Sequence, residues 1–341
     1  MTSVLPRTTV DADTPVRHDV HAPGTDFGAL TVVHTRHWGR WILGALVVFV
    51  VAQLVWSLFT EPGYHWDVFA KYFFAPAILR GLGLTLLLTV VAGSIGFVAG
   101  GVLALMRLSK SPLLSSFAWA FIWFFRSIPL LVQVIVWFNL GYLYPTIGLG
   151  IPFTAEYFVE FQTVSLISAF AAAVLGLALH QAAYSAEIIR GGILSVDQGQ
   201  LEAAAALGLP ARVRVTRIIL PQAARSILPN AFNEIIGLLK GTSIVSVIAL
   251  SEVFYVTQVI YNRNHMVIPM LAVAVVWYTI LTTVLSIAQF YIERHFAKGS
   301  VRELPPTPIQ RARRWVSEQW ARLEDEPAPV PAKAAPEEAR S

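Results

Sequence analysis

Two basic side chains stand inside stretches that are otherwise apolar. Arg126 lies in "FAWAFIWFFRSIPLL", and Lys240 is followed directly by Gly241, Thr242 and Ser243 in "IIGLLKGTSIVSV". A charge inside a bilayer costs about 3 kcal/mol or more, so such residues usually face a partner or a watery cavity. An ammonium beside two hydroxyls could hold a carboxylate. Lys240, Thr242, Ser243 and Arg126 are therefore candidates for a substrate path.

Both basic residues also have a structural interpretation. A buried ion pair, or a long side chain that reaches the membrane surface, would satisfy the charge without any substrate. For Lys240 the two interpretations stay open. For Arg126 the structural one is favoured, because its span can begin close to the membrane surface.

Other kinds of chemistry find no support in the sequence. The chain has no cysteine, which excludes disulfides, thiolate metal sites and cysteine nucleophiles, and its eight histidines are scattered. "GLLKGTS" lacks the Gly-Lys-Ser/Thr order of a phosphate-binding loop. We therefore expect no catalytic site, no metal site and no cofactor in this chain, and no binding of nucleic acid.

The composition is that of a membrane protein. Of the 341 residues, 55% are hydrophobic and only 13% are charged, and the mean hydropathy is +0.60. Soluble domains carry roughly 25% charged residues. Six stretches reach the length of about 20 residues that a helix needs to cross the bilayer. They are 41–59, 83–106, 114–143, 164–183, 231–250 and 267–292.

Lysine and arginine in the loops predict the orientation, because they gather on the cytoplasmic side. With a cytoplasmic amino terminus, twenty of the twenty-five basic residues fall on that side. Only Lys71, Arg80 and Arg263 fall outside. Both termini are therefore expected to be cytoplasmic. In the second span, "AGSIGFVAGG" (92–101) indicates close helix packing by small residues rather than nucleotide binding.

The stretch "LEAAAALGLPARVRVTRIILP" (201–221) is the most structured polar part. Residues 200–207 favour a helix that Asp197 could cap, and Gly208 fits the position after a helix end, where positive φ is needed. Pro210 fits the start of a second, basic helix. Exposed alanines would let another protein approach closely. Just before this hairpin, Glu187 and Arg190 are spaced for an i,i+3 ion pair. From the residues alone, the hairpin could equally be only a connector between two spans.

The same stretch resembles the EAA signature of binding-protein-dependent ABC importer permeases. The matching positions are Glu202, Ala203, Ala204, Gly208, Ile218, Leu220 and Pro221. In that family the loop docks on the cytoplasmic ATPase. "AAYSAEIIRGG", "FRSIPLLVQ" and "LLKGTSIVSVIALSEV" are similar to elements of the polar amino-acid branch, although Gly241 stands where an aspartate is common. The resemblance runs from about residue 81 to 296 and leaves 144–161 as an apparent insertion.

The resemblance implies an all-α polytopic fold with a five-helix permease core and, here, one extra amino-terminal span. The expected parts are a polar tail (1–40), the extra helix (41–60), an external surface segment (61–80), the transport domain (81–296, with the coupling loop at 184–225) and a cytoplasmic tail (297–341). The implied partners in the cell membrane are ABC ATPase subunits, which hold ATP and Mg²⁺, an external solute-binding protein, and a second identical or homologous permease.

The implied function is ATP-driven import of a polar amino acid, in which closure of the ATPase is coupled to alternating access. The missing acid at Gly241 favours an acidic or neutral cargo over a cationic one. Two rivals remain. A secondary transporter driven by an ion gradient could use Arg126 and Lys240 but leaves Glu202 and Gly208 unexplained. A membrane scaffold that does not transport would recruit partners through the tails.

Overall fold

The computed structural model describes residues 38–150, 157–296, 310–311 and 313–317. The expectations for the tails at 1–37, 297–309 and 318–341, and for part of the apparent insertion at 151–156, fall outside these residues. The chain divides into two units, at 1–61 and 62–341. In the first unit, α1 (Trp38–Thr60) is apolar on all sides and has no buried residue. This is the pattern of a helix surrounded by lipid.

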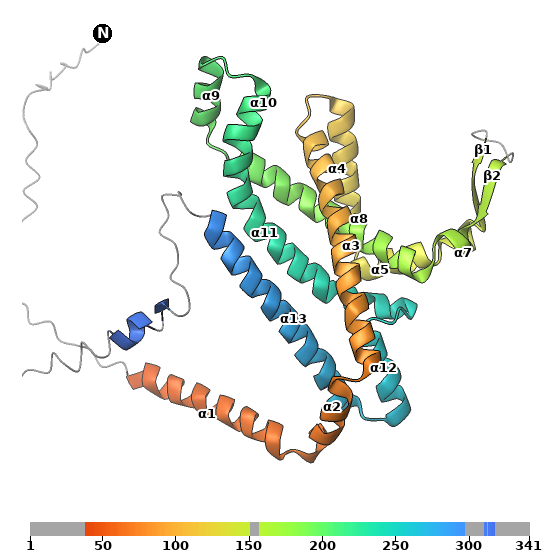
Figure 1. Cartoon of the computed structure of the whole chain (residues 1–341), viewed down its shortest axis with the longest axis vertical. Helices are drawn as coiled ribbons and strands as arrows, with labels where there is room; N and C mark the ends of the chain where they lie inside the picture. The colour runs from red at the N-terminus through yellow and green to blue at the C-terminus, as the bar shows by residue number, and fades with distance from the viewer. Residues whose placement is uncertain (1–37, 151–156, 297–309, 312, 318–341) are drawn as a thin grey trace, which may run out of the picture. The chain divides into compact units, whose positions relative to one another are not determined.

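The second unit is built around two long helices, α3 (Pro76–Arg107) and α8 (Ala169–Leu194), which pack against each other more extensively than any other described pair (Figure 1). Glycines make this close approach possible. A Cβ added at Gly96 would lie 2.6 Å from Gln181 Cβ, and one added at Gly100 would lie 2.6 Å from Ser185 Cβ. The predicted small-residue packing is confirmed, with α8 as the partner.

The third predicted span is a broken helix. α4 (Pro112–Ser127) and α5 (Leu130–Phe138) meet at an angle of 99°. Pro129 lacks the N–H that would continue the ladder, which leaves carbonyls free at the break. The buried Gln133 amide donates to two of them, Phe125 O at 2.9 Å and Ile128 O at 2.8 Å. Pro129 therefore breaks the predicted span, and Gln133 stabilises the break.

The insertion at 144–161 contains the only strands of the described residues. After α6 (Leu140–Leu143), the antiparallel strands β1 (Thr146–Gly150) and β2 (Tyr157–Gln162) form a hairpin, followed by α7 (Thr163–Leu166). From the sequence this region stood out only as an apparent insertion. The aromatic and β-branched residues of "YFVEFQ" were the signal that could have indicated a strand.

The predicted outer surface segment is shorter than expected. α2 (Trp66–Phe73) packs against α13 (Val267–Phe296), where the Trp277 indole donates to Phe73 O at 2.9 Å. α3 already begins at Pro76, which is favoured in the first turn of a helix. Arg80, predicted in the outer loop, therefore lies in a helix.

A short helical turn, η2 (Pro62–Tyr64), precedes α2. Residues 198–221, which we call the coupling stretch, follow α8. The elements from there to the last span are α9 (Gln198–Ala206), α10 (Ala211–Val213), the π-helix η3 (Arg214–Ile219), α11 (Leu220–Gly241), the 3₁₀ helix η4 (Thr242–Ile248) and α12 (Val253–Asn264). Figure 1 shows α9 and α10 at the same end of the unit as the α3–α4 connection. Within the described residues five helices are long and apolar enough to cross a membrane, and the bent α4–α5 pair makes a sixth.

Candidate functional site

The coupling stretch begins with a short capped helix. The Asp197 carboxylate accepts a hydrogen bond from Gln200 N at 3.1 Å, which confirms the predicted N-cap of α9. The helix ends at Gly208, whose φ of +64° confirms the predicted left-handed turn. The Gly208 and Leu209 N–H groups donate back to the carbonyls of Ala205 and Ala204. Only local bonds therefore shape this turn.

The predicted docking residues of α9 do not all face outward. Glu202 and Ala203 are exposed, but Ala204 is only 2% exposed and packs inward. Leu207, which the sequence analysis did not select, is 77% exposed.

The second, basic helix begins after Pro210 as predicted, and it runs on far beyond Pro221. α10, η3 and α11 follow one another as a helical run from Ala211 that continues through η4 to Ile248. Pro221 explains the π-helical turn, because it has no N–H for the carbonyl one turn earlier and the preceding turn widens. Ile218 lies half-buried, whereas Leu220 is 51% exposed. The basic residues thus lie at the start of a long helical run that contains a candidate membrane span.

A pocket of about 370 Å³ lies beside Lys240, between α11, α12 and α13. Lys240 and Ser243 line it, together with Thr279 and Tyr278 of α13. Lys240 is exposed and takes part in no ion pair among the described residues. Thr242 is fully buried and donates to Leu239 O at 2.7 Å, so the structure does not bring it to the pocket. Thr279, which sequence reasoning missed, supplies a hydroxyl instead.

Behind this pocket lies a buried carboxylate that sequence reasoning also missed. Glu252 is 0% exposed and accepts hydrogen bonds from Phe254 N at 2.9 Å and Tyr255 N at 2.7 Å, which caps α12. It also accepts from the Tyr278 hydroxyl at 2.8 Å. Burial raises the pKa of the Glu252 carboxyl, and these hydrogen bonds act against the rise. Local propensity did not indicate this cap, because the following run "VFYVTQ" is rich in β-branched and aromatic residues that favour strands.

Two contacts from α3 complete the Glu252 cluster, which we define as Glu252, Tyr278, Thr85 and Gly81. Val253 N donates to Thr85 Oγ1 at 3.3 Å. A Cβ added at Gly81 would lie 3.1 Å from Glu252 C, so only glycine lets the backbone of α3 approach this closely. The cluster thus joins α3, α12 and α13 directly behind the pocket.

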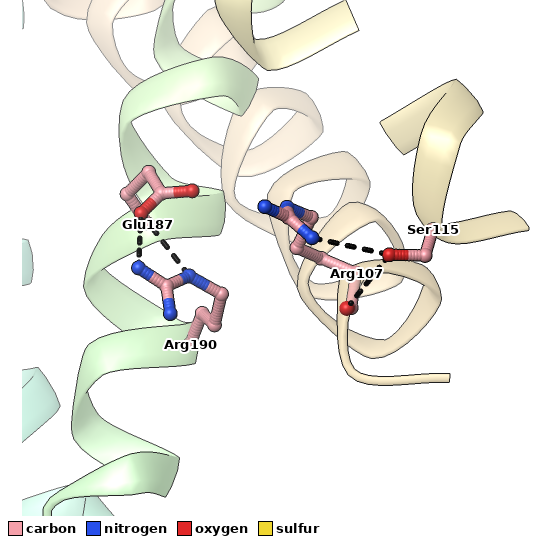
Figure 2. A network of polar contacts seen from close by, with 4 residues as sticks. All are labelled: Arg107, Ser115, Glu187 and Arg190. Atoms are coloured by element: carbon pink, nitrogen blue, oxygen red, sulfur yellow. Dashed lines mark hydrogen bonds and ion pairs between the residues drawn. The ribbon is translucent and has the colours of Figure 1, made fainter. Parts of the chain in front are cut away.

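Arg126 belongs to a different cavity. Its guanidinium lies 5.1 Å from the ring centre of Tyr184 on α8, in a cavity between α3, α4 and α8 that Arg107, Glu187 and Arg190 also line. The predicted Glu187–Arg190 pair is confirmed at 2.7 Å, and Figure 2 shows it beside Arg107, which donates to Ser115 Oγ at 3.1 Å. The two embedded basic residues, Arg126 and Lys240, therefore do not share one site.

Comparison with known proteins places this architecture among transport proteins. Residues 92–298 match the family described as "Binding-protein-dependent transport system inner membrane component". An arginine transport system permease protein of Corynebacterium glutamicum is 41% identical over 271 residues, which cover 79% of this chain and 84% of the relative. A glutamate/aspartate import permease protein of Escherichia coli O6:H1 is 37% identical over 225 residues, 65% of this chain and 94% of the relative.

A solved structure shows the same likeness. The crystal structure of an amino acid ABC transporter with histidines matches at a TM-score of 0.56 and 33% identity, over 66% of this chain and 96% of the solved one.

Proposed function

This chain belongs to the family of inner-membrane components of binding-protein-dependent transport systems, and from that premise we propose that it moves a polar amino acid through a path beside Lys240. The predicted family, the all-α multi-pass fold, the location in the cell membrane and the function as an ABC importer permease are confirmed. Its partners are ATPase subunits and an external binding protein. We propose, in addition, that the cargo passes beside Lys240 and that the ATPase controls this path through the coupling stretch.

The observation that supports this proposal most strongly is the helical run from the coupling stretch to the pocket. α9 connects through the Gly208 turn to the run that starts at Ala211, and Lys240 lies in the last turn of α11 on the same run. We take this continuous run to carry displacement from one end to the other, with the π-helical turn and Pro229 as the points where it can bend. Movement of α9 by the ATPase would therefore shift Lys240 and Ser243 relative to α13. Such a shift would favour one of two arrangements of the path over the other, as alternating access requires.

The pocket chemistry fits the backbone carboxylate of an amino acid. The Lys240 ammonium supplies the charge, and the Thr279 hydroxyl supplies a neutral hydrogen bond. The Ser243 hydroxyl donates to Lys240 O at 2.8 Å and would have to rotate away from that carbonyl to donate to the cargo. The relatives are named for arginine and for glutamate/aspartate, which differ in side-chain charge but share this carboxylate. We assign the pocket to the shared group. The side chain of the cargo would be read by other groups, including those of a second permease.

The other roles follow from the same premise. We assign Glu202, Ala203, Gly208 and the exposed Leu207 to docking on the ATPase, with Ile218, Leu220 and Pro221 shaping the turn into α11. ATP and Mg²⁺ would be held by the ATPase, and this chain would catalyse no reaction. The parts expected at 1–40, 41–60, 61–80, 81–296 and 297–341 remain our proposed division of the chain.

Uptake by proteoliposomes tests the cargo. The full chain is reconstituted with its ATPase and binding protein, and uptake of labelled arginine and labelled glutamate is measured with and without ATP inside. We expect ATP-dependent uptake of at least one, competition by polar amino acids and none by a sugar. Lys240→Ala should lower uptake about tenfold or more, because a charge-assisted bond contributes about 1.5–3 kcal/mol. Lys71→Ala, an exposed lysine of α2, is the control. Uptake that follows an ion gradient without ATP would refute the mechanism.

Cysteine labelling tests the orientation on this cysteine-free background. Ala205→Cys places a thiol on the exposed side of α9. A reagent that cannot cross the membrane should label it only after the cells are opened. Asp67→Cys, in α2 on the predicted outer side, should be labelled in intact cells. The reverse pattern would overturn the orientation.

A further inference from the structure

The cavity between α3, α4 and α8 takes no part in the path proposed above. It has a volume of about 440 Å³, and three guanidinium groups line it: Arg107 at the end of α3, Arg126 near the end of α4, and Arg190 near the end of α8. Each comes from a different helix. Like charges that lie close together repel one another, so a cavity lined by three basic side chains calls for a negative group that offsets the repulsion.

The acidic groups of the cavity do not balance this charge. Glu187 is the one carboxylate in the lining, and Arg190 already binds it through two hydrogen bonds of 2.7 and 3.1 Å. Among the described residues the Arg107 guanidinium donates to the neutral Ser115 Oγ at 3.1 Å and pairs with no carboxylate, and Arg126 lies over the Tyr184 ring. Figure 2 shows the Glu187–Arg190 pair and Arg107 on facing helices. Glu234 of α11 acts on Arg126 electrostatically but makes no ion pair among the described residues.

The surroundings of the cavity indicate its depth in the membrane. Arg107 leads into the α3–α4 connection, and Arg190 lies little more than a turn from the end of α8, where the coupling stretch follows. Both points belong to the predicted cytoplasmic side. Trp119 and Trp123 stack on α4 with ring centres 6.2 Å apart and are 53% and 59% exposed. Exposed tryptophans favour the headgroup level of a bilayer.

We propose that this cavity binds the phosphate of an anionic phospholipid from the cytoplasmic leaflet. The planar guanidinium groups of Arg107 and Arg126 match phosphate oxygens in pairs, which an ammonium cannot do. Basic pockets between spanning helices on the cytoplasmic side are suited to such headgroups. The exposed apolar surface of α4 beside the cavity, including Trp119 and Trp123, provides the wall along which acyl chains lie. A free phosphate ion would have no use for that wall.

Native mass spectrometry tests the proposal on the full chain purified with its ATPase. Phosphatidylglycerol is titrated against phosphatidylcholine with the same acyl chains. We expect the wild type to prefer phosphatidylglycerol, and Arg107→Gln with Arg126→Gln to weaken its binding about 25-fold, since each basic residue near the surface contributes about fivefold. The matched control is Arg80→Gln with Arg263→Gln, which removes two exposed arginines elsewhere. It should keep the wild-type preference.

Three further measurements make the outcome decisive. Arg107→Lys with Arg126→Lys keeps the charges but loses the paired geometry, so its affinity should lie between those of the wild type and the glutamine variant. The unfolding temperature of each variant shows whether it is folded, and the lysine pair serves if the glutamine pair is not. An excess of inorganic phosphate should displace little lipid. Equal binding of both lipids, equal losses in both double variants, or a site that takes inorganic phosphate without lipid preference would each overturn the proposal.

Discussion

Two helices in this protein start with a carboxylate cap, and the two caps are held in opposite ways. Asp197 caps α9 on the surface of the coupling stretch, with one hydrogen bond to its own helix. Glu252 caps α12 in the interior, where Tyr278 of α13 also donates to it and Gly81 of α3 packs on its backbone. The same local chemistry therefore makes a movable part in one place and a fixed junction in the other.

The difference follows from what surrounds each cap. A surface helix held by local bonds can open or turn at small cost, as a docking element must. A buried polar cluster is costly to disturb, since any partner that is lost leaves groups unpaired away from water. We therefore expect changes in the Glu252 cluster to act on stability and changes in the coupling stretch to act on transport.

Glu252→Ala should give the largest loss of stability. It removes the acceptor for Phe254 N, Tyr255 N and the Tyr278 hydroxyl, and each buried donor left unpaired costs about 1–3 kcal/mol. The free energy of unfolding should therefore fall by about 3 kcal/mol or more. Thermal unfolding of the purified chain in detergent measures this.

Two companion variants sharpen the result for Glu252. Tyr278→Phe removes only one donor and should cost about 1 kcal/mol. Glu160→Ala, on the exposed strand β2, should change the unfolding free energy by less than about 0.5 kcal/mol. If Glu252→Ala were as stable as Glu160→Ala, the Glu252 cluster would not be the junction that we describe.

Gly100→Ala should give an intermediate loss, and its neighbour should behave in the opposite way. The added Cβ would lie 2.6 Å from Ser185 Cβ and 2.9 Å from Ala182 O, so α3 and α8 must separate, at a cost of about 1–3 kcal/mol. At Gly101 the nearest atom is 3.9 Å away, and Gly101→Ala should stabilise the helix by up to about 1 kcal/mol. Unfolding temperatures of the two variants that shift in the same direction would contradict the packing of α3 on α8.

The sequence predicted the locally determined features well. The cap at Asp197, the positive φ at Gly208 and the Glu187–Arg190 pair depend on neighbours within a few residues, so pattern alone indicates them. The apolar stretches likewise predicted the spans. The extent of α3 was underestimated, because Arg80 and the preceding residues do not look like a membrane segment.

The missed features depend on residues far apart in the chain. Glu252 and Thr85 meet across more than 160 positions, and no local pattern shows that an acid after "VIALS" will be buried. Thr242, which was predicted to line the path, is fully buried, whereas Thr279, for which nothing was predicted, lines the pocket. Side-chain direction at a helix break depends on tertiary packing.

Gly208→Val should have the smallest effect on stability and a large effect on transport. A Cβ at Gly208 meets no atom within 4 Å, so the change introduces no clash. It acts only through φ, which is +64° and costs a β-branched residue about 1–2 kcal/mol or more. Because the turn is exposed and held by local bonds, the chain can relieve this strain by reorienting α9. The unfolding temperature should hardly move, while α9 no longer presents Glu202 and Leu207 at the angle that the ATPase requires.

Uptake and co-purification of the ATPase, measured on the same preparations, separate these effects. Gly208→Asn is the matched control, because asparagine adopts positive φ readily, and it should keep most of the uptake. Gly208→Val should lose most of its uptake. The ATPase should either bind weakly to this variant or bind without driving transport. Normal uptake in Gly208→Val would remove the turn from the coupling mechanism. A large drop in its unfolding temperature would instead show that the coupling stretch is a fixed part of the fold, as the Glu252 cluster is, and the contrast between the two caps would fail.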